Sequence, residues 1–229
     1  MPDPTQYMLK LPAQNRPAPF NAPEKVYPDI HWYNQNRATN RVFHSVDGIE
    51  AVVIHATAGG SSQSALSWWK HPQGAKASAH WIVPGEEEDA HGKFAWAVVY
   101  EALAAWHVRN SVSHTEFGNR KKINHWSLGI EIVNRQVPGD PYSDWQMTTT
   151  ALLIRYCWAK YPNLKYVFSH AFVDPTRRSD PGDNFDWARF QTLVLSQNND
   201  PSVDALAAAM ANQVATQSAS PVNGMPCCM

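Results

Sequence analysis

Short apolar runs alternate with amphipathic stretches through the middle of the chain. Compact apolar runs rich in β-branched or aromatic residues predict buried strands, and apolar residues at helical spacing predict helices. The expected strands are IEAVVIH (49–55), AHWIV (79–83), FAWAVVY (94–100), SLGIEIV (127–133) and LKYVFSH (164–170). The expected helices cover residues 61–70, about 144–160 and 183–195. This alternation predicts an α/β fold, a single domain with a central mixed β-sheet flanked by helices.

The strand expected at SLGIEIV alternates strictly between two faces. Leu128, Ile130 and Ile132 are expected on one side and Glu131 on the other, because side chains alternate along a strand. A surface carboxylate on an alternating strand is common, so this pattern leaves open whether Glu131 has a chemical role. The acidic loop EEEDAHGK (86–93) is expected to be a solvated turn.

The two ends of the chain differ from its middle in composition. Seven of the first 28 residues are proline, which removes backbone donors and disfavours helix. Residues 1–47 are therefore expected to form a proline-rich arm that packs along the domain through hydrophobic residues such as Leu9. Residues 48–196 are expected to form the domain, and residues 197–229 an Ala-rich helix with a flexible tail.

Charge and cysteine content exclude several classes of protein. The 229 residues contain 19 Lys and Arg and 20 Asp and Glu, a formal charge of −1. Nucleic-acid binding and polybasic membrane binding are therefore not expected, because both depend on a positive face. No apolar run approaches the roughly 18 residues of a membrane span. Cys157, Cys227 and Cys228 form neither a disulfide framework nor a paired C-x-x-C zinc site.

The first residues, MPDPTQYMLKLPAQNRP, lack the basic region and apolar stretch of a secretory signal peptide. We therefore expect synthesis in the cytoplasm without a signal peptide. The protein would then either stay in the cytoplasm or leave it by a non-classical route.

Two histidines share a placement that suggests a metal site. His55 and His170 each end an apolar run, so each is expected as the last residue of a buried strand, at the rim of the sheet. Asp180 follows ten residues after His170 in a Pro-Gly turn. Two histidines and one carboxylate are the ligands of an open catalytic zinc site. Spacing alone leaves alternatives open, because structural histidines are common and four aspartates follow His170, at 174, 180, 183 and 186.

Several motifs together resemble the zinc-dependent N-acetylmuramoyl-L-alanine amidases of the type 2 amidase and peptidoglycan-recognition family. They are VVIHATAGG, SAHWIV, AWHVRNS, NHWSLGIEIVN and FSHAFVDPTRRSDPG, followed by FDW. The resemblance runs from about residue 49 to residue 190 and is nearest to the bacterial branch that recycles or trims muropeptides. It implies the type 2 amidase fold for that region and covers neither the arm nor the tail.

The resemblance also implies roles for individual residues. One zinc ion per chain would be held by His55, His170 and Asp180. Glu131 would act as the acid–base group that moves a proton from the attacking water to the departing amine. Arg178 stands where the family usually has Lys, and its fixed charge suits stabilisation of an oxyanion rather than proton donation.

Two further histidines match family positions at the substrate cleft. His107 lies in the A-W-H motif and His80 in the S-x-H motif, and both are expected to bind substrate. From the residues alone, a histidine packed beside Trp106 is nearly as good an interpretation of His107. Relatives that carry a tyrosine beside the position of His80 have it where this chain has Ala79.

The resemblance implies hydrolysis of the amide bond between N-acetylmuramic acid and L-alanine, in intact cell wall or in soluble muropeptides. Muropeptide recycling, phage lysis and antibacterial attack are all compatible roles, and an effector would have an immunity or inhibitor protein as partner. The main alternative is a binding module that holds peptidoglycan without cleaving it, although such members generally lack a metal ligand. A Ser-His-Asp hydrolase is disfavoured because no G-x-S-x-G motif is present.

Overall fold

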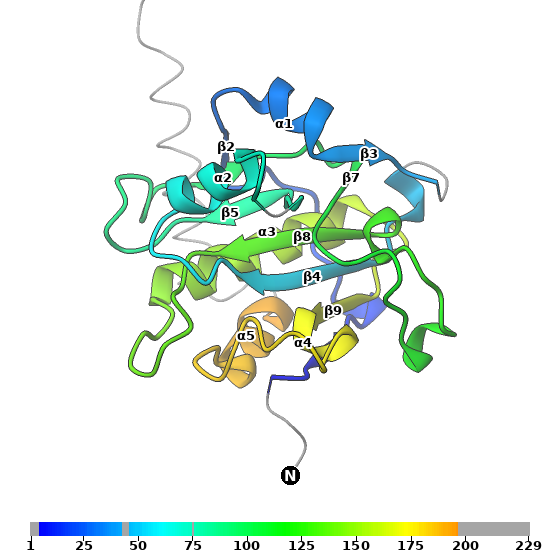
Figure 1. Ribbon diagram of the computed structural model, residues 1–229. Helices are drawn as coiled ribbons and strands as arrows, with labels where there is room; N and C mark the ends of the chain where they lie inside the picture. Colours follow the sequence, from blue (N-terminus) through cyan, green and yellow to red (C-terminus); the bar gives the residue numbers. More distant parts are fainter. Residues whose placement is uncertain (1–4, 43–45, 75, 197–229) are drawn as a thin grey trace, which may run out of the picture.

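A seven-stranded sheet forms the centre of the computed structural model, which describes residues 5–42, 46–74 and 76–196 (Figure 1). The four central strands run parallel, and antiparallel pairs lie toward the edges, so the predicted α/β fold with a central mixed sheet is confirmed. In spatial order the strands are β1 (Met8–Lys10), β9 (Tyr166–Ser169), β4 (Ala51–Ala56), β8 (Ser127–Ile132), β5 (Trp81–Val83), β6 (Ala95–Ala97) and β2 (Glu24–Val26).

Helices and short turns surround the sheet. The α-helices are α1 (Ile30–Asn36), α2 (Ser62–Lys70), α3 (Asp144–Lys160), α4 (His170–Val173) and α5 (Trp187–Leu195). A second, two-stranded sheet joins β3 (Ala38–Asn40) to β7 (Leu103–Ala105). Single 3-10 turns are η1 (Ala13–Asn15), η2 (Val46–Gly48), η3 (Thr115–Phe117) and η4 (Ile123–His125). Within the described ranges, no helix combines the length and apolar character needed to span a membrane.

The register of the central strands decides which residues meet. β4 is buried along nearly its whole length, as expected for a parallel strand covered on both faces. It pairs with β8 so that His55 lies opposite Glu131, and with β9 so that Ile54 lies opposite Ser169. His55, Glu131 and the residue after Ser169 therefore gather at the carboxyl end of the parallel strands.

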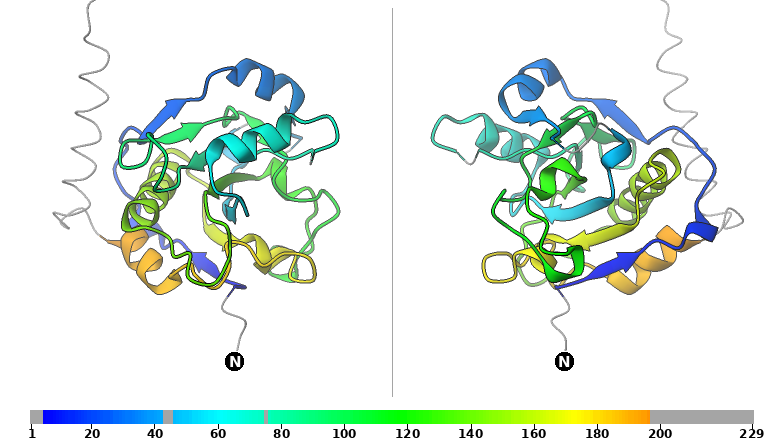
Figure 2. Two further views of the ribbon diagram at one scale, coloured as in Figure 1. Left: turned by 60° about the vertical axis from the view of Figure 1, so that its left-hand side comes forward. Right: turned by 90° about the vertical axis from the view of Figure 1, so that its right-hand side faces the viewer.

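The long helix α3 covers one face of the sheet, with α5 beside it (Figures 1 and 2). It begins at a capping box, in which the side chains of Ser143 and Gln146 each accept a hydrogen bond from the backbone N–H of the other. The predicted alternation of β8 is confirmed, because its three apolar residues all point into this core. The shared cluster includes Val52, Ile54, Leu128, Ile130, Ile132, Met147, Ala151, Ile154 and Trp158.

The opposite face is covered by α2 and by the segment 106–126. Its apolar residues form two clusters, one around Leu66, Trp69, Ile82 and Val133 and one around Val53, Ile123, Trp126 and Phe168. His55 and Glu131 belong to this face, because each alternates with a strand residue that points toward α3.

The proline-rich arm contributes strands to both edges of the sheet. β1 pairs with β9 at one edge, and β2 pairs with β6 at the other. Tyr7 stacks on Trp187 with ring centroids 4.4 Å apart, which joins the start of the arm to α5. Figure 2 shows this first strand, in dark blue, beside the orange α5.

All five strands are shorter than the apolar runs that predicted them, and two are shortened most. In the run 94–100 only β6 forms. In the run 164–170 the strand ends at Ser169, whose side chain accepts a hydrogen bond from the backbone of Phe172 and so caps α4. His170 is therefore the first residue of a short helix, and its prediction as the last residue of a strand is wrong.

The last helix also begins later than predicted. α5 starts at Trp187 rather than at residue 183, because the Asp186 side chain accepts the backbone N–H of Arg189 and fixes the helix start there. The Ala-rich helix and tail expected at 197–229 lie outside the described residues.

The arm is also tied to the end of α3, and this tie yields a stability prediction. The Arg16 guanidinium donates to the carbonyls of Tyr161, at 2.8 Å, and Pro162, at 2.9 Å, and to that of Trp158. Arg16→Ala should lower the free energy of unfolding by about 2 kcal/mol, because hydrogen bonds to charged groups contribute roughly 1.5–3 kcal/mol. Urea denaturation followed by circular dichroism measures this change.

The control for this prediction is Arg189→Ala. That arginine pairs with the highly exposed Asp144, and a solvent-exposed pair contributes only about 0–1 kcal/mol. Equal losses in the two variants would show that the carbonyl contacts of Arg16 do not stabilise the fold.

Candidate active site

Three side chains singled out in the sequence converge at the carboxyl end of the central strands. His55 Nδ1 lies 3.0 Å from His170 Nδ1 and 3.1 Å from Asp180 Oδ2, and the latter two atoms are 3.0 Å apart. All three residues are buried, and their ligand atoms are close enough together to hold one metal ion. The structure therefore brings His55, His170 and Asp180 into a single candidate metal centre.

Each of these side chains is held by a different element. His55 is fixed by β4, and His170 opens α4. The Asp180 loop is tied back to α4 by a hydrogen bond of 3.1 Å from the Ala171 N–H to the Asp180 carbonyl. The Tyr142 hydroxyl donates to the Pro181 carbonyl at 2.7 Å and holds the other side of the loop. The donor atoms are thus placed by main-chain contacts as well as by their own packing.

Burial sets the charge state of these groups. Burial, assisted by the neighbouring His170, lowers the pKa of His55 to about 4, so this imidazole is neutral at pH 7. Burial alone would raise the pKa of Asp180, but hydrogen bonds from His170 and His55 hold that pKa below its ordinary value. Asp180 is therefore an anion at neutral pH, in contact with a neutral imidazole.

This donor set fits a divalent cation. Two imidazole nitrogens and a carboxylate oxygen lie within 3.1 Å of one another, and each can offer a lone pair to a positive ion placed among them. Two histidines and one carboxylate are also a known ligand set for catalytic zinc, which keeps a fourth position free.

Glu131 extends from β8 beside His55. Its Oε2 atom is buried and has no hydrogen-bond partner among the described residues. Burial, with a contribution from the negative charge of Asp180, raises the pKa of Glu131 to about 8, and Arg178 opposes this rise. A carboxyl group with this pKa can both take up and release a proton near neutral pH. The buried Oε2 atom shows that Glu131 is not a fully solvated surface carboxylate, and its chemical role stays a prediction.

An open cavity lies against the metal centre on the side of His170. It is lined by His107 and His170 together with three basic side chains, those of Lys76, Arg109 and Arg178. No carboxylate side chain lies among its lining residues. Arg109 is paired with Asp174 at 2.8 Å, so the exposed Lys76 and Arg178 supply the positive charge that favours an anionic ligand group in this cavity.

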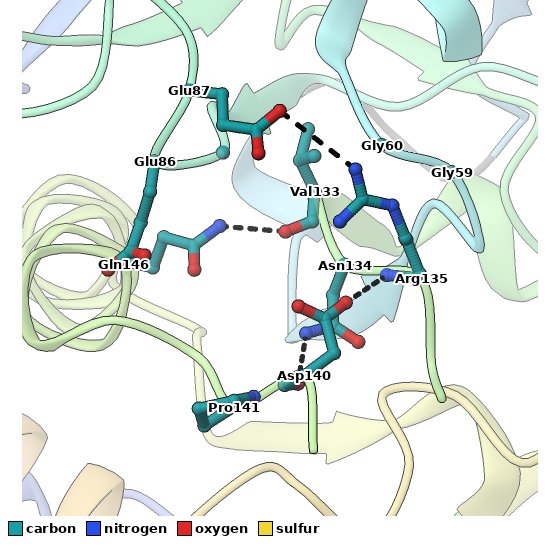
Figure 3. A pocket seen from close by; sticks show the side chains of 11 residues that line it. Gly59, Gly60, Glu86, Glu87, Val133, Asn134, Arg135, Asp140, Pro141 and Gln146 are labelled. Atoms are coloured by element: carbon teal, nitrogen blue, oxygen red, sulfur yellow. Dashed lines mark hydrogen bonds and ion pairs between the residues drawn. The ribbon is translucent and has the colours of Figure 1, made fainter. Parts of the chain in front are cut away.

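A second cavity at this end of the sheet has a different charge. Figure 3 shows Glu87 and Arg135 directed toward one another across it, with Arg135 Nη2 3.9 Å from Glu87 Oε2. The Arg135 N–H donates to Asp140 Oδ2 at 2.7 Å, and Glu86 also lines the wall. Three carboxylates against one guanidinium make this cavity acidic. Its residues come from separate loops and from the start of α3, and no periodic pattern in the sequence joins them.

The acidic loop 86–93 is not simply a solvated turn. The carboxylate of Glu88 accepts hydrogen bonds from the Ser62 N–H at 2.9 Å, the Ser62 hydroxyl at 3.1 Å and the Gly85 N–H at 2.7 Å. Glu88 therefore anchors the loop to the first turn of α2, and the neighbouring Glu86 and Glu87 are left facing the cavity.

His107 lies closer to the metal centre than the sequence indicated. It is buried, and its Nδ1 lies 3.1 Å from Nε2 of the metal-site residue His55. Its Nε2 lies 3.3 Å from the Ser127 hydroxyl. His107 also lines the basic cavity, so a substrate contact by it stays a prediction.

His80 is placed differently from the sequence expectation. It is fully buried, and its Nδ1 accepts the Gly129 N–H at 2.9 Å. The other ring nitrogen then carries the proton and faces the Leu103 carbonyl at 3.1 Å, with Arg41 Nη2 3.2 Å away. Because both ring nitrogens are engaged inside the protein, His80 has a structural role, and the expected substrate contact by this residue is not supported.

Comparison with known proteins gives one family match. The sequence model of Amidase_2, N-acetylmuramoyl-L-alanine amidase, matches residues 45–183. The 1,6-anhydro-N-acetylmuramyl-L-alanine amidase AmpD of Escherichia coli is 35% identical over 94 residues, which are 41% of this chain and 48% of AmpD. The N-acetylmuramoyl-L-alanine amidase AmiD of the same organism is 30% identical over 148 residues, 61% of this chain and 51% of AmiD.

Among solved structures, the chain resembles E. coli AmiD in complex with the substrate anhydro-N-acetylmuramic acid-L-Ala-D-γ-Glu-L-Lys. The TM-score is 0.52 at 28% identity, and the match covers 64% of this chain and 57% of that structure. The chain spans about half the length of the curated relatives it matches.

The geometry predicts which aspartate of the loop binds a metal. Asp180→Ala should weaken zinc binding by more than the roughly 10–100-fold typical of a residue that only supports a ligand. Asp183→Ala is the matched control, because Asp183 is an exposed aspartate of the same loop and should leave zinc affinity unchanged. Chelator competition on metal-free protein measures both affinities. If Asp183→Ala lost zinc binding while Asp180→Ala kept it, the metal ligand would be Asp183 and our assignment would be wrong.

Proposed function

The chain belongs to the Amidase_2 family of N-acetylmuramoyl-L-alanine amidases, and from this premise we propose that it is a zinc-dependent amidase. Its reaction is hydrolysis of the amide bond that joins N-acetylmuramic acid to the L-alanine of the stem peptide. One observation carries the proposal: the convergence of His55, His170 and Asp180 at 3.0–3.1 Å beside the buried carboxyl group of Glu131.

The donor set supports zinc as the metal. His55, His170 and Asp180 would hold the ion and leave one coordination position free. A zinc ion bound there supplies a Lewis acid that lowers the pKa of a bound water to roughly 7 and polarises the scissile carbonyl.

Glu131 is the group that moves the proton. In the reaction the oxygen of a water molecule bonds to the carbonyl carbon and the carbon–nitrogen bond breaks. Glu131 takes the proton that the water loses and delivers it to the departing nitrogen of L-alanine, so the carboxylate is regenerated. Its buried position supports this role, because a carboxyl group with a pKa raised toward neutrality can act in both directions.

Arg178 supplies a fixed positive charge at the same cavity. The positive charge of the guanidinium can stabilise negative charge that develops on the carbonyl oxygen, and arginine is poorly suited to donate a proton in catalysis. Its place on the cavity wall beside His170 supports this assignment.

The two cavities support a substrate that carries both charges. The basic cavity suits carboxylates, and the acidic cavity around Glu86 and Glu87 suits an amine. A muropeptide stem such as L-Ala-D-γ-Glu-L-Lys, which is bound in the AmiD structure, contains both kinds of group. A muropeptide or its polymer, peptidoglycan, is therefore the proposed substrate.

Product analysis tests the proposal. Purified protein loaded with zinc is incubated with soluble anhydro-muropeptide and, separately, with intact sacculi, and the products are identified by mass. Release of a peptide with a free L-alanine amino terminus is the expected result. Binding of either substrate without cleavage would favour the alternative of a non-catalytic peptidoglycan-binding module.

Glu131→Gln should separate proton transfer from metal binding. The amide has nearly the shape of the carboxyl group but cannot carry the proton, so the turnover rate should fall by about 10²–10⁴. Zinc content, measured by elemental analysis, should stay at the wild-type level. Loss of zinc from this variant would make Glu131 a ligand and overturn its assignment.

Arg178 can be tested with its neighbour as control. Arg178→Ala should lower the turnover rate by about 10²-fold, the usual effect of removing one oxyanion donor, without emptying the metal site. Arg178→Lys keeps the positive charge and should retain most activity. Arg177→Ala removes an adjacent exposed arginine that pairs with Asp174 and should have little effect. An equal fall in turnover rate in Arg178→Ala and Arg177→Ala would show that the loss of any nearby positive charge has this effect, and would contradict a specific role for Arg178.

A further inference from the structure

We propose that His107 is a positioning residue for the metal ligand His55. It holds the His55 imidazole in the tautomer and orientation that present Nδ1 to the metal. The inference rests on the metal site of the proposed function, and it assigns His107 a role other than substrate contact.

Three hydrogen bonds link Ile123, Ser127, His107 and His55 in a row, and the Ile123 end decides which group donates in each. The Ile123 carbonyl can only accept, so the Ser127 hydroxyl, 2.8 Å away, donates its proton there. The Ser127 oxygen then accepts from His107 Nε2–H at 3.3 Å. With its proton on Nε2, His107 has a lone pair on Nδ1.

That lone pair decides the tautomer of the metal ligand. His107 Nδ1 lies 3.1 Å from His55 Nε2, so it accepts a proton carried on Nε2. The other nitrogen of His55, Nδ1, is then unprotonated and faces His170 and Asp180. A ligating histidine is commonly oriented in this way by a hydrogen-bond acceptor on its second nitrogen.

The surroundings of His107 keep its ring in place. Asn124 Oδ1 accepts the backbone N–H of His107 at 3.3 Å and that of Val108 at 2.8 Å, which fixes the main chain. The ring itself lies against Gly129 of β8, where a Cβ atom would come within 2.6 Å of His107 Cγ. Only glycine at position 129 leaves room for this ring.

The two histidines of the metal centre differ in whether their second ring nitrogen has a hydrogen-bond partner. His170 Nε2 is buried and has no hydrogen-bond partner among the described residues. His55, in contrast, has a partner whose own ring is fixed, and the two rings meet edge to face at 5.2 Å between centroids. Of the two histidines, His55 is therefore the one that a hydrogen bond orients, and His107 is its partner.

Two substitutions at position 107 distinguish positioning from packing. Leucine matches the volume of histidine but has no acceptor, whereas asparagine is smaller but can place Oδ1 near the position of Nδ1. Positioning predicts that His107→Leu binds zinc about 10–100-fold more weakly and that His107→Asn stays closer to wild type. Packing alone predicts the opposite order, because asparagine leaves a gap.

A third variant disturbs the ring without changing either histidine. Gly129→Ala should push His107 away from its place and weaken zinc binding in the same direction as His107→Leu. Zinc affinity is measured for each metal-free protein by chelator competition, and circular dichroism of the same samples confirms folding. KM and kcat are then measured at saturating zinc, which separates the loss of metal from any effect on substrate binding.

The outcomes separate this inference from the proposed function. Wild-type zinc affinity in His107→Leu, with or without a raised KM, would overturn the positioning role while leaving the metal site intact. Weaker binding in His107→Asn than in His107→Leu would overturn it in favour of packing. A wild-type protein that binds no zinc would instead refute the metal site itself, and the inference with it.

Discussion

The parallel pairing of β4 with β8 on one side and β9 on the other is the constraint on which the site depends. Apolar cores on both faces of the sheet fix the register of these strands, since a slip of one residue would exchange their two faces. In the observed register His55 lies beside Glu131, and His170 follows directly after β9. The hydrophobic packing of the sheet thus sets the positions of the candidate metal ligands His55 and His170 relative to Glu131.

The sequence was sufficient where local periodicity carries the information. The alternation of β8 placed Glu131 on the face opposite Ile130 and Ile132, as observed. The apolar run before His55 predicted it as the last residue of a strand, and β4 extends one residue further, to Ala56. Asp180 is different, because four aspartates follow His170 and only the family resemblance distinguished among them. Its carboxylate reaches the site through tertiary contacts, such as the bond from the Ala171 N–H to its carbonyl, that no local pattern encodes.

The roles of His80 and His107 could not be separated from the sequence, because both depend on Gly129. The main chain of this glycine donates to His80, and its missing side chain leaves room for His107 on the face of the sheet that carries His55. One histidine thereby becomes a structural residue and the other a neighbour of the metal centre. The pairing of the arm with the sheet could not be predicted from the sequence either, because neither β1 nor β2 is adjacent in sequence to its partner strand.

The pairing of β1 with β9 has a consequence for the order of folding. The Tyr7 N–H donates to the Ser169 hydroxyl across 162 residues of chain, and the Ser169 N–H donates to the Tyr7 carbonyl. During synthesis the first strand leaves the ribosome long before its partner exists, and contacts of such high sequence separation form slowly. The residue beside Ser169 is His170, a member of the candidate metal centre. That centre therefore forms late in the maturation of this chain, only after nearly the whole described domain has been translated.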